Sequence, residues 1–115
     1  MFSVIFPGQG SQFVGMTKDL YNNYTYIKDL FKLADEILGY SITKIILEGS
    51  KEELDLTQNT QPAIFISSFS IFEMIKRESK IKLSDAKYLA GHSLGEYSAL
   101  AAAGSLDFES ALKLL

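Results

Sequence analysis

The sequence predicts an α/β fold with a parallel sheet, and three features carry this prediction. Two short apolar runs, residues 3–6 and 87–91, suit buried strands, and a glycine-containing loop follows each of them. The segments between and after these runs have the apolar spacing of helices. Strands that alternate with helices along a chain are typical of a parallel sheet covered by helices. We therefore expect a three-layer arrangement around one sheet.

Composition places the chain among ordinary folded proteins and excludes several functions. Of its 115 residues, 47% are hydrophobic and 22% are charged, which suffices for one modest core. Eleven basic residues are scattered among fourteen acidic ones, giving a net charge of −3, so we expect no nucleic-acid partner. Cysteine is absent, which excludes disulfides and thiolate metal sites, and no apolar run reaches the roughly 18 residues that span a membrane. We expect a cytoplasmic protein with no bound metal and no membrane contact.

Helix signals follow the first strand. Apolar residues at positions 20, 24, 27, 31, 34 and 38 predict one amphipathic helix that ends at Gly39. A short helix is expected over residues 43–47. Ser50 and Glu53 then have the spacing of a capping box, which predicts that another helical turn begins there.

Three more helices are expected in the second half of the chain. Thr60 and Pro62 are helix-start signals, and the apolar run after them predicts a largely buried helix to residue 79. The β-branched and aromatic content of this run would also suit a strand, but its length favours a helix. An alanine-rich helix is expected over residues 94–103, and a further one begins at Asp107.

The stretch LAGHSLGEYSALAAAG places Ser93 between two glycines, immediately before the alanine-rich helix. Ser93 and Glu96 have capping-box spacing, so a purely structural role is one interpretation. A cap has no need for Gly91, however, and Gly95 costs roughly 1 kcal/mol relative to alanine in a helix. The nucleophile elbow, G-x-S-x-G, requires both glycines because the strand must turn sharply into the helix. The pattern therefore favours a serine nucleophile for acyl transfer.

Such a nucleophile needs amide donors for the oxyanion that forms on the attacked carbonyl. The Leu94 amide, at the start of the helix, is one candidate. The loop PGQGSQ after the first strand supplies the other, the Gln9 amide, because adjacent parallel strands bring their loops to one edge. A phosphate-binding role for this loop is rejected, since Phe13 stands where G-x-G-x-x-G needs its third glycine and no P-loop lysine follows.

Three motifs, FPGQGSQ, TQPA and GHSLGEYSALAAAG, occur in an order that resembles the malonyl-CoA:acyl-carrier-protein transacylases of fatty acid synthesis. The resemblance implies a hydrolase-like acyltransferase core. It also implies that Ser93 takes a malonyl group from coenzyme A and passes it to the phosphopantetheine thiol of acyl carrier protein. By matching positions, the Gln9 and Leu94 amides form the oxyanion hole, and Gln61 of TQPA lies near the active site. Gln61 could equally be a helix-start residue. No bound cofactor is implied.

The base that would activate Ser93 is not evident. His92 is the only histidine, and it should face away from the Ser93 hydroxyl because successive side chains of an extended strand point to opposite faces. The resemblance implies a histidine far downstream and an arginine that binds the malonyl carboxylate, and Arg77 does not match that arginine. We therefore expect residues 1–115 to be the N-terminal part of a single acyltransferase domain, truncated before its later strands and smaller inserted subdomain. Alone, this part should be inactive, and the complete enzyme should be a monomer.

Three alternatives stay open on the sequence. An esterase-like serine hydrolase shares the elbow and would release acyl groups to water. The acyltransferase module of a polyketide synthase belongs to the same superfamily. A noncatalytic module in which Ser93 is only a helix cap is the third. The resemblance implies that the residues that select the acyl group lie mainly downstream of residue 115.

Overall fold

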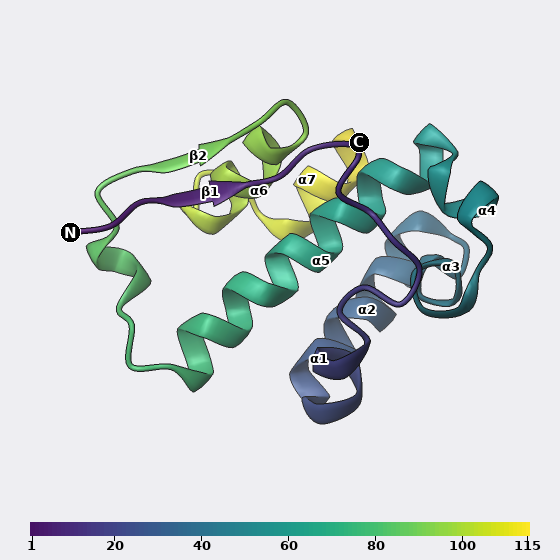
Figure 1. Ribbon diagram of the computed structural model, residues 1–115, viewed down its shortest axis with the longest axis horizontal. Helices are drawn as coiled ribbons and strands as arrows, with labels where there is room; N and C mark the ends of the chain where they lie inside the picture. The colour runs from purple at the N-terminus through teal and green to yellow at the C-terminus, as the bar shows by residue number, and fades with distance from the viewer.

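The computed structural model describes all 115 residues and has two strands joined and followed by helices (Figure 1). In chain order the elements are β1 (Val4–Phe6), α1 (Lys18–Asn23), α2 (Thr25–Leu38), α3 (Ile42–Glu48), α4 (Lys51–Asp55), α5 (Thr57–Glu78), the 3₁₀ helix η1 (Leu83–Asp85), β2 (Leu89–Gly91), α6 (Gly95–Ala102) and α7 (Phe108–Leu114). Figure 1 shows α1–α4 grouped at one end of α5, with the strands and α6 toward the other.

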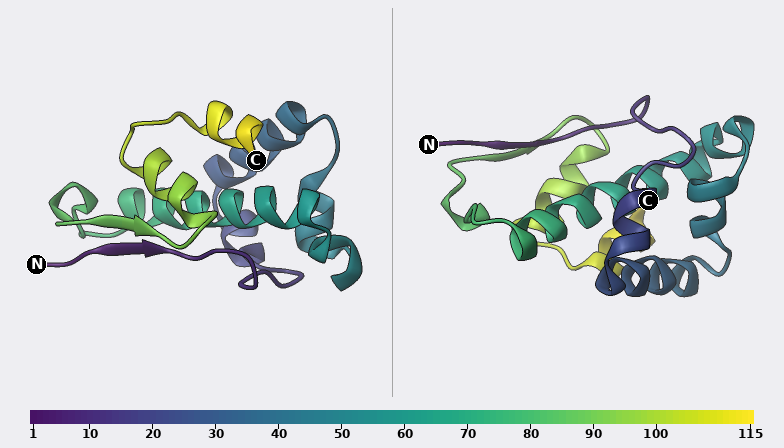
Figure 2. Two further views of the ribbon diagram at one scale, coloured as in Figure 1. Left: turned by 90° about the horizontal axis from the view of Figure 1, so that it is seen from above. Right: turned by 60° about the horizontal axis from the view of Figure 1, so that its bottom comes forward.

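The two strands form a parallel sheet, as the sequence predicts. Val4 lies opposite Leu89 and Phe6 opposite Gly91, and both views in Figure 2 show the strands side by side. Phe6 is buried against α5 and α6, whereas Ile5, on the opposite face, is 76% exposed. Residues 1–115 therefore supply the sheet and the helices on one of its faces. Because the strands are parallel, the loops that follow them emerge at the same edge.

Two apolar clusters hold the elements in place. The larger joins α2, α3, α4, α5, α6 and α7 around Phe31 and Phe65, both fully buried. The smaller contains Phe6, Phe72 and Ala99, and it fixes β1 against α5 and α6. The helix α6 thus has one side on the sheet and the other on the main core, which sets the position of the elbow before it.

Several helix ends follow the predicted signals. The Ser50 hydroxyl accepts a hydrogen bond from the Glu53 amide, so the capping box at the start of α4 is confirmed. Gly39 ends α2 with φ 80°, a left-handed conformation that glycine adopts without strain. The Asp107 carboxylate accepts from the Ser110 amide at the start of α7.

The single helix predicted over residues 20–38 is wrong in one respect, because Tyr24 interrupts it. Tyr24 is extended, with φ −129° and ψ 120°, and separates α1 from α2. Asn22 and Asn23 precede the break, and asparagine side chains compete with the helix for backbone hydrogen bonds. The Tyr24 carbonyl then accepts from the amides of residues 27 and 28 and begins α2.

The predicted start of the long helix at Thr60 and Pro62 is also wrong, since α5 already begins at Thr57. Thr60 does not cap the helix. Its hydroxyl donates to the carbonyls of Leu54 and Leu56, which anchors the turn before α5. Pro62 lies inside the helix, where it cannot donate to the Gln58 carbonyl. That carbonyl accepts instead from the Tyr40 hydroxyl, which replaces the lost bond.

No helix is both long and apolar enough to cross a membrane. No cluster of three or more histidine, cysteine, aspartate or glutamate side chains has the arrangement of a metal site.

Candidate active site

Ser93 lies at a sharp turn between β2 and α6. The strand ends at Gly91, and the helix begins at Gly95. Ser93 itself has φ 54°, a left-handed conformation that costs a residue with a side chain roughly 1–2 kcal/mol. A strained serine on an exposed strand-to-helix turn is the defining geometry of a nucleophile elbow.

The two flanking glycines are required by close backbone contacts. A methyl group on Gly91 would overlap the Gly95 carbonyl and the Glu96 amide nitrogen. A methyl group on Gly95 would overlap the Phe6 carbonyl at the end of β1. The elbow therefore closes on itself at Gly91 and packs onto β1 at Gly95. These contacts explain both glycines of G-x-S-x-G in this chain.

Ser93 does not cap α6. The Glu96 amide donates to the Ser93 backbone carbonyl at 2.9 Å, not to the side chain. The N-cap residue is Leu94, and no side-chain hydrogen bond caps this helix. The capping-box interpretation of Ser93 and Glu96 is therefore wrong, and the hydroxyl is not committed to the helix start.

The loop after β1 forms a tight turn beside the elbow. The Ser11 amide donates to the Gly8 carbonyl at 3.3 Å, and Gly10 has φ 108°. Gln9 does not have a positive φ, so the turn is of type II, the class with glycine at its third position. The His92 amide donates to the Phe6 carbonyl at 3.1 Å and ties the elbow to the strand that leads into this turn.

The two candidate oxyanion donors lie on these adjacent segments. Neither the Gln9 amide nor the Leu94 amide donates to a backbone carbonyl. The amides of residues 95, 96 and 97, by contrast, all donate to carbonyls of the elbow. Free amides on two neighbouring loops are the arrangement that an oxyanion hole requires.

His92 contacts the first loop. A methyl group on Gly8 would lie 2.5 Å from the His92 carbonyl oxygen and 3.1 Å from its Nδ1 atom. The close approach explains why residue 8 is a glycine, a requirement that no local sequence pattern indicates. The imidazole Nδ1 thus lies beside Gly8 of the first loop.

Arg77 is remote from the elbow. It lies in the last turn of α5, where its Nε donates to Glu73 at 3.3 Å. Its guanidinium also stacks over the Tyr26 ring, 4.4 Å from the ring centroid. The structure thus gives Arg77 a local role on the helix surface.

Gln61 and Ser93 line one open cavity of about 250 Å³. Leu94, Glu96 and Tyr97 line the same cavity. Gln61 lies in the interior of α5, not at its start, so the helix-start interpretation of this residue is wrong. The packing of α5 against α6 brings the TQPA motif to the elbow.

The sequence model of the acyl transferase domain family matches residues 3–115 of this chain. The chain belongs to this family. Its sequence is 51% identical over 108 residues to the malonyl CoA-acyl carrier protein transacylase of Bacillus subtilis (strain 168), covering 94% of this chain and 33% of that protein. The chain is also 46% identical over 114 residues to the protein of the same name from Haemophilus influenzae. This match covers 99% of this chain and 36% of that protein.

Solved structures agree with this acyl transferase assignment. A malonyl-transacylase in complex with an acyl carrier protein of a type II polyketide synthase matches with a TM-score of 0.90 and 40% identity. The match covers 98% of this chain and 36% of that chain. The resemblance and the predicted α/β fold with a parallel sheet are confirmed; of the three expected layers, residues 1–115 contain the sheet and one helical layer. The chain spans about a third of the length of the relatives that it matches.

Proposed function

We propose that the protein transfers a malonyl group from coenzyme A to the phosphopantetheine thiol of acyl carrier protein, through a malonyl ester of Ser93. The observation that carries the proposal is the strained, uncapped serine beside two free amides on adjacent loops. The likeness to transacylases supports malonyl-CoA as donor and acyl carrier protein as acceptor. We place the reaction in the cytoplasm and assign it no bound cofactor.

In the first half-reaction, the Ser93 oxygen attacks the thioester carbonyl of malonyl-CoA and loses its proton to a base. The carbon–sulfur bond then breaks, and coenzyme A leaves as a thiol after taking up a proton. In the second half-reaction, the carrier thiol attacks the seryl ester and the Ser93 hydroxyl forms again. We propose that the Gln9 and Leu94 amides stabilise both oxyanions, that Gln61 contacts the substrate, and that no residue in 1–115 serves as the base.

We expect Gln9→Pro to slow transfer by about 10²- to 10³-fold, because it deletes one oxyanion donor. Gln9→Ala keeps that amide and should stay within about tenfold of the parent. Proline suits the second position of a type II turn, so the substitution should leave the turn intact. Steady-state kinetics of both variants, after circular dichroism has shown equal folding, make the comparison. Equal turnover would mean that the Gln9 amide is not a donor.

The proposed transfer is tested by incubating the full-length protein with malonyl-CoA, with and without holo acyl carrier protein. We expect release of coenzyme A to be fast only when the carrier is present, and malonyl carrier protein to accumulate in equal amount. An esterase-like hydrolase would release malonate at the same rate without the carrier. That result, or inertness in both mixtures, would refute the proposal.

A polyketide pathway is a second candidate destination for the malonyl group. It is favoured by the likeness to the transacylase solved with a polyketide carrier protein. Comparing fatty-acid and polyketide carrier proteins as acceptors in the same assay would separate the two destinations. The chemistry at Ser93 is the same in both.

A further inference from the structure

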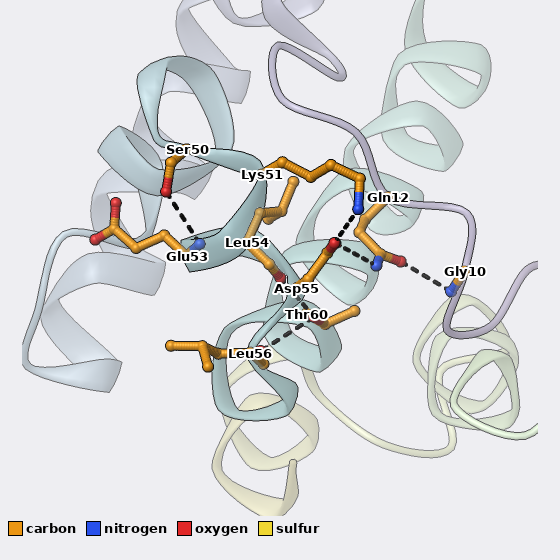
Figure 3. A network of polar contacts seen from close by, with 9 residues as sticks. All are labelled: Gly10, Gln12, Ser50, Lys51, Glu53, Leu54, Asp55, Leu56 and Thr60. Carbon is orange, nitrogen blue, oxygen red and sulfur yellow. Dashed lines mark hydrogen bonds and ion pairs between the residues drawn. The ribbon is translucent and has the colours of Figure 1, made fainter.

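A hydrogen-bonded network ties the turn after β1 to helix α4 (Figure 3). The Gly10 amide donates to Oε1 of Gln12 at 2.8 Å, and Nε2 of Gln12 donates to Oδ1 of Asp55 at 2.9 Å. Nζ of Lys51 pairs with the other carboxylate oxygen of Asp55. The catalytic scheme uses none of these three side chains, yet Gln12, bonded to Asp55, holds the peptide next to Gln9.

The network controls the one peptide that can flip within the turn. Type I and type II turns differ in the orientation of the central peptide, which here joins Gln9 to Gly10. A flip would carry the Gly10 N–H away from Gln12 and break their bond. The bond that closes the turn, from the Ser11 amide to the Gly8 carbonyl, is long at 3.3 Å against a usual 2.9–3.0 Å. Residues 9–11 of the turn are also exposed, so the closing hydrogen bond holds the turn only weakly.

The orientation of the Gln9 amide depends on this turn. The Gln9 N–H and the Gly8 carbonyl belong to one trans peptide, so they point in opposite directions. While the Gly8 carbonyl faces the Ser11 amide, the Gln9 N–H faces outward and is free. A turn that opens would lose this arrangement, whereas a flip of the central peptide alone keeps the bond between Ser11 and Gly8 that type I and type II turns share. Holding Gly10 in place therefore holds the Gln9 amide as well.

We propose that Gln12 and Asp55 are positioning residues for the oxyanion hole, with the Asp55 carboxylate orienting the Gln12 amide group that fixes the Gly10 peptide. The inference rests on the proposed acyl transfer. A neutral amide can bind through either end, and the carboxylate selects the end that presents its oxygen to Gly10. Hydrogen bonds from Lys51 and from Gln12 hold the pKa of Asp55 below its usual range, which keeps this acceptor charged at neutral pH.

The network can be tested in the full-length protein by exchanging the amide group of Gln12 with the carboxylate of Asp55. Gln12→Glu keeps an acceptor for the Gly10 amide but sets a second carboxylate against Asp55, and we expect kcat to fall about tenfold with KM unchanged. Asp55→Asn keeps an acceptor for Nε2 of Gln12 and should cost less than about threefold. In the double variant the introduced amide can donate to the introduced carboxylate, so kcat should return to within about threefold of the parent.

Rescue in the double variant distinguishes positioning from general stability. Lys51→Met is the matched control, because it removes the ion pair and leaves the Gln12 bonds in place; its kcat should be unchanged. A double variant no faster than Gln12→Glu alone would overturn the proposal. A rise in KM with kcat constant would also overturn it.

Hydrogen exchange of the Gly10 amide, followed by NMR, tests the network without any reaction. Asp55→Ala should speed this exchange about tenfold even though Gly10 and Gln12 are unchanged, because the Gln12 amide group is no longer oriented. Unchanged exchange would contradict the network. If the parent protein transfers no malonyl group, the proposed function fails, whereas the exchange result still decides whether Asp55 holds the turn.

Discussion

Ser93→Ala is expected to lower kcat for malonyl transfer by about 10⁶-fold, the loss seen when a serine hydrolase loses its nucleophile. Without the hydroxyl no seryl ester forms. The oxyanion hole can then assist only the direct attack of the acceptor on malonyl-CoA. The thermal midpoint should hold or rise slightly, because alanine neither fills new space nor breaks a cap at this exposed position. Steady-state kinetics and a thermal melt of the full-length protein give both values.

Ser98→Ala is the matched control for Ser93→Ala. Ser98 lies in the same motif, is 1% exposed and has no hydrogen-bond partner for its hydroxyl. Removing an unpartnered buried hydroxyl is close to neutral for stability, so this variant should fold and turn over like the parent. Equal losses in the two variants would mean that the motif is needed for folding and that Ser93 has no chemical role.

Gly91→Ala is expected to destabilise the fold by about 3 kcal/mol or more, because its methyl group would overlap backbone that cannot move aside. The contact is with the Gly95 carbonyl and the Glu96 amide nitrogen, at the first turn of α6. Relief would require the elbow to open, which would also displace Ser93. Chemical denaturation and the rate of malonyl transfer should therefore both be strongly affected.

Gly104→Ala provides the comparison that separates overlap from backbone strain. Gly104 has φ 79° but no atom within 4 Å of an added methyl group, so its substitution costs only the left-handed conformation, about 1 kcal/mol. Equal losses of unfolding free energy at the two positions would contradict the tight elbow.

The sequence predicts the parts of the fold that depend on local signals. Short apolar runs followed by glycine-containing loops predict the strands around Phe6 and Leu89. The sequence also predicts the helix cap at Ser50, because its partner, Glu53, lies three residues away. The elbow belongs to this group, since the glycines that permit it flank Ser93 in the chain. In each case the residues that signal the element lie within a few positions of one another in the chain.

The parts that the sequence did not predict depend on distant partners. Pro62 looked like a helix start, but the Tyr40 hydroxyl supplies the bond that a proline inside a helix forgoes. Glu96 is an exception with a local cause: it has capping-box spacing, but its amide donates to the Ser93 backbone carbonyl and not to the Ser93 hydroxyl. Gln12 stands within the PGQGSQ motif, but its partner Asp55 is 43 residues further along the chain. No local pattern identifies such a pair.

The central claim is that Ser93 carries the acyl group, and mass spectrometry of the trapped intermediate tests it most directly. The full-length protein is incubated with malonyl-CoA, quenched in acid and digested with trypsin, which releases residues 88–113 as one peptide. We predict that this peptide gains the mass of one malonyl group and that fragment ions place it on Ser93. The added mass should be removed when holo acyl carrier protein is supplied before the quench. A malonyl group on another residue, or the same labelling in Ser93→Ala, would contradict the account.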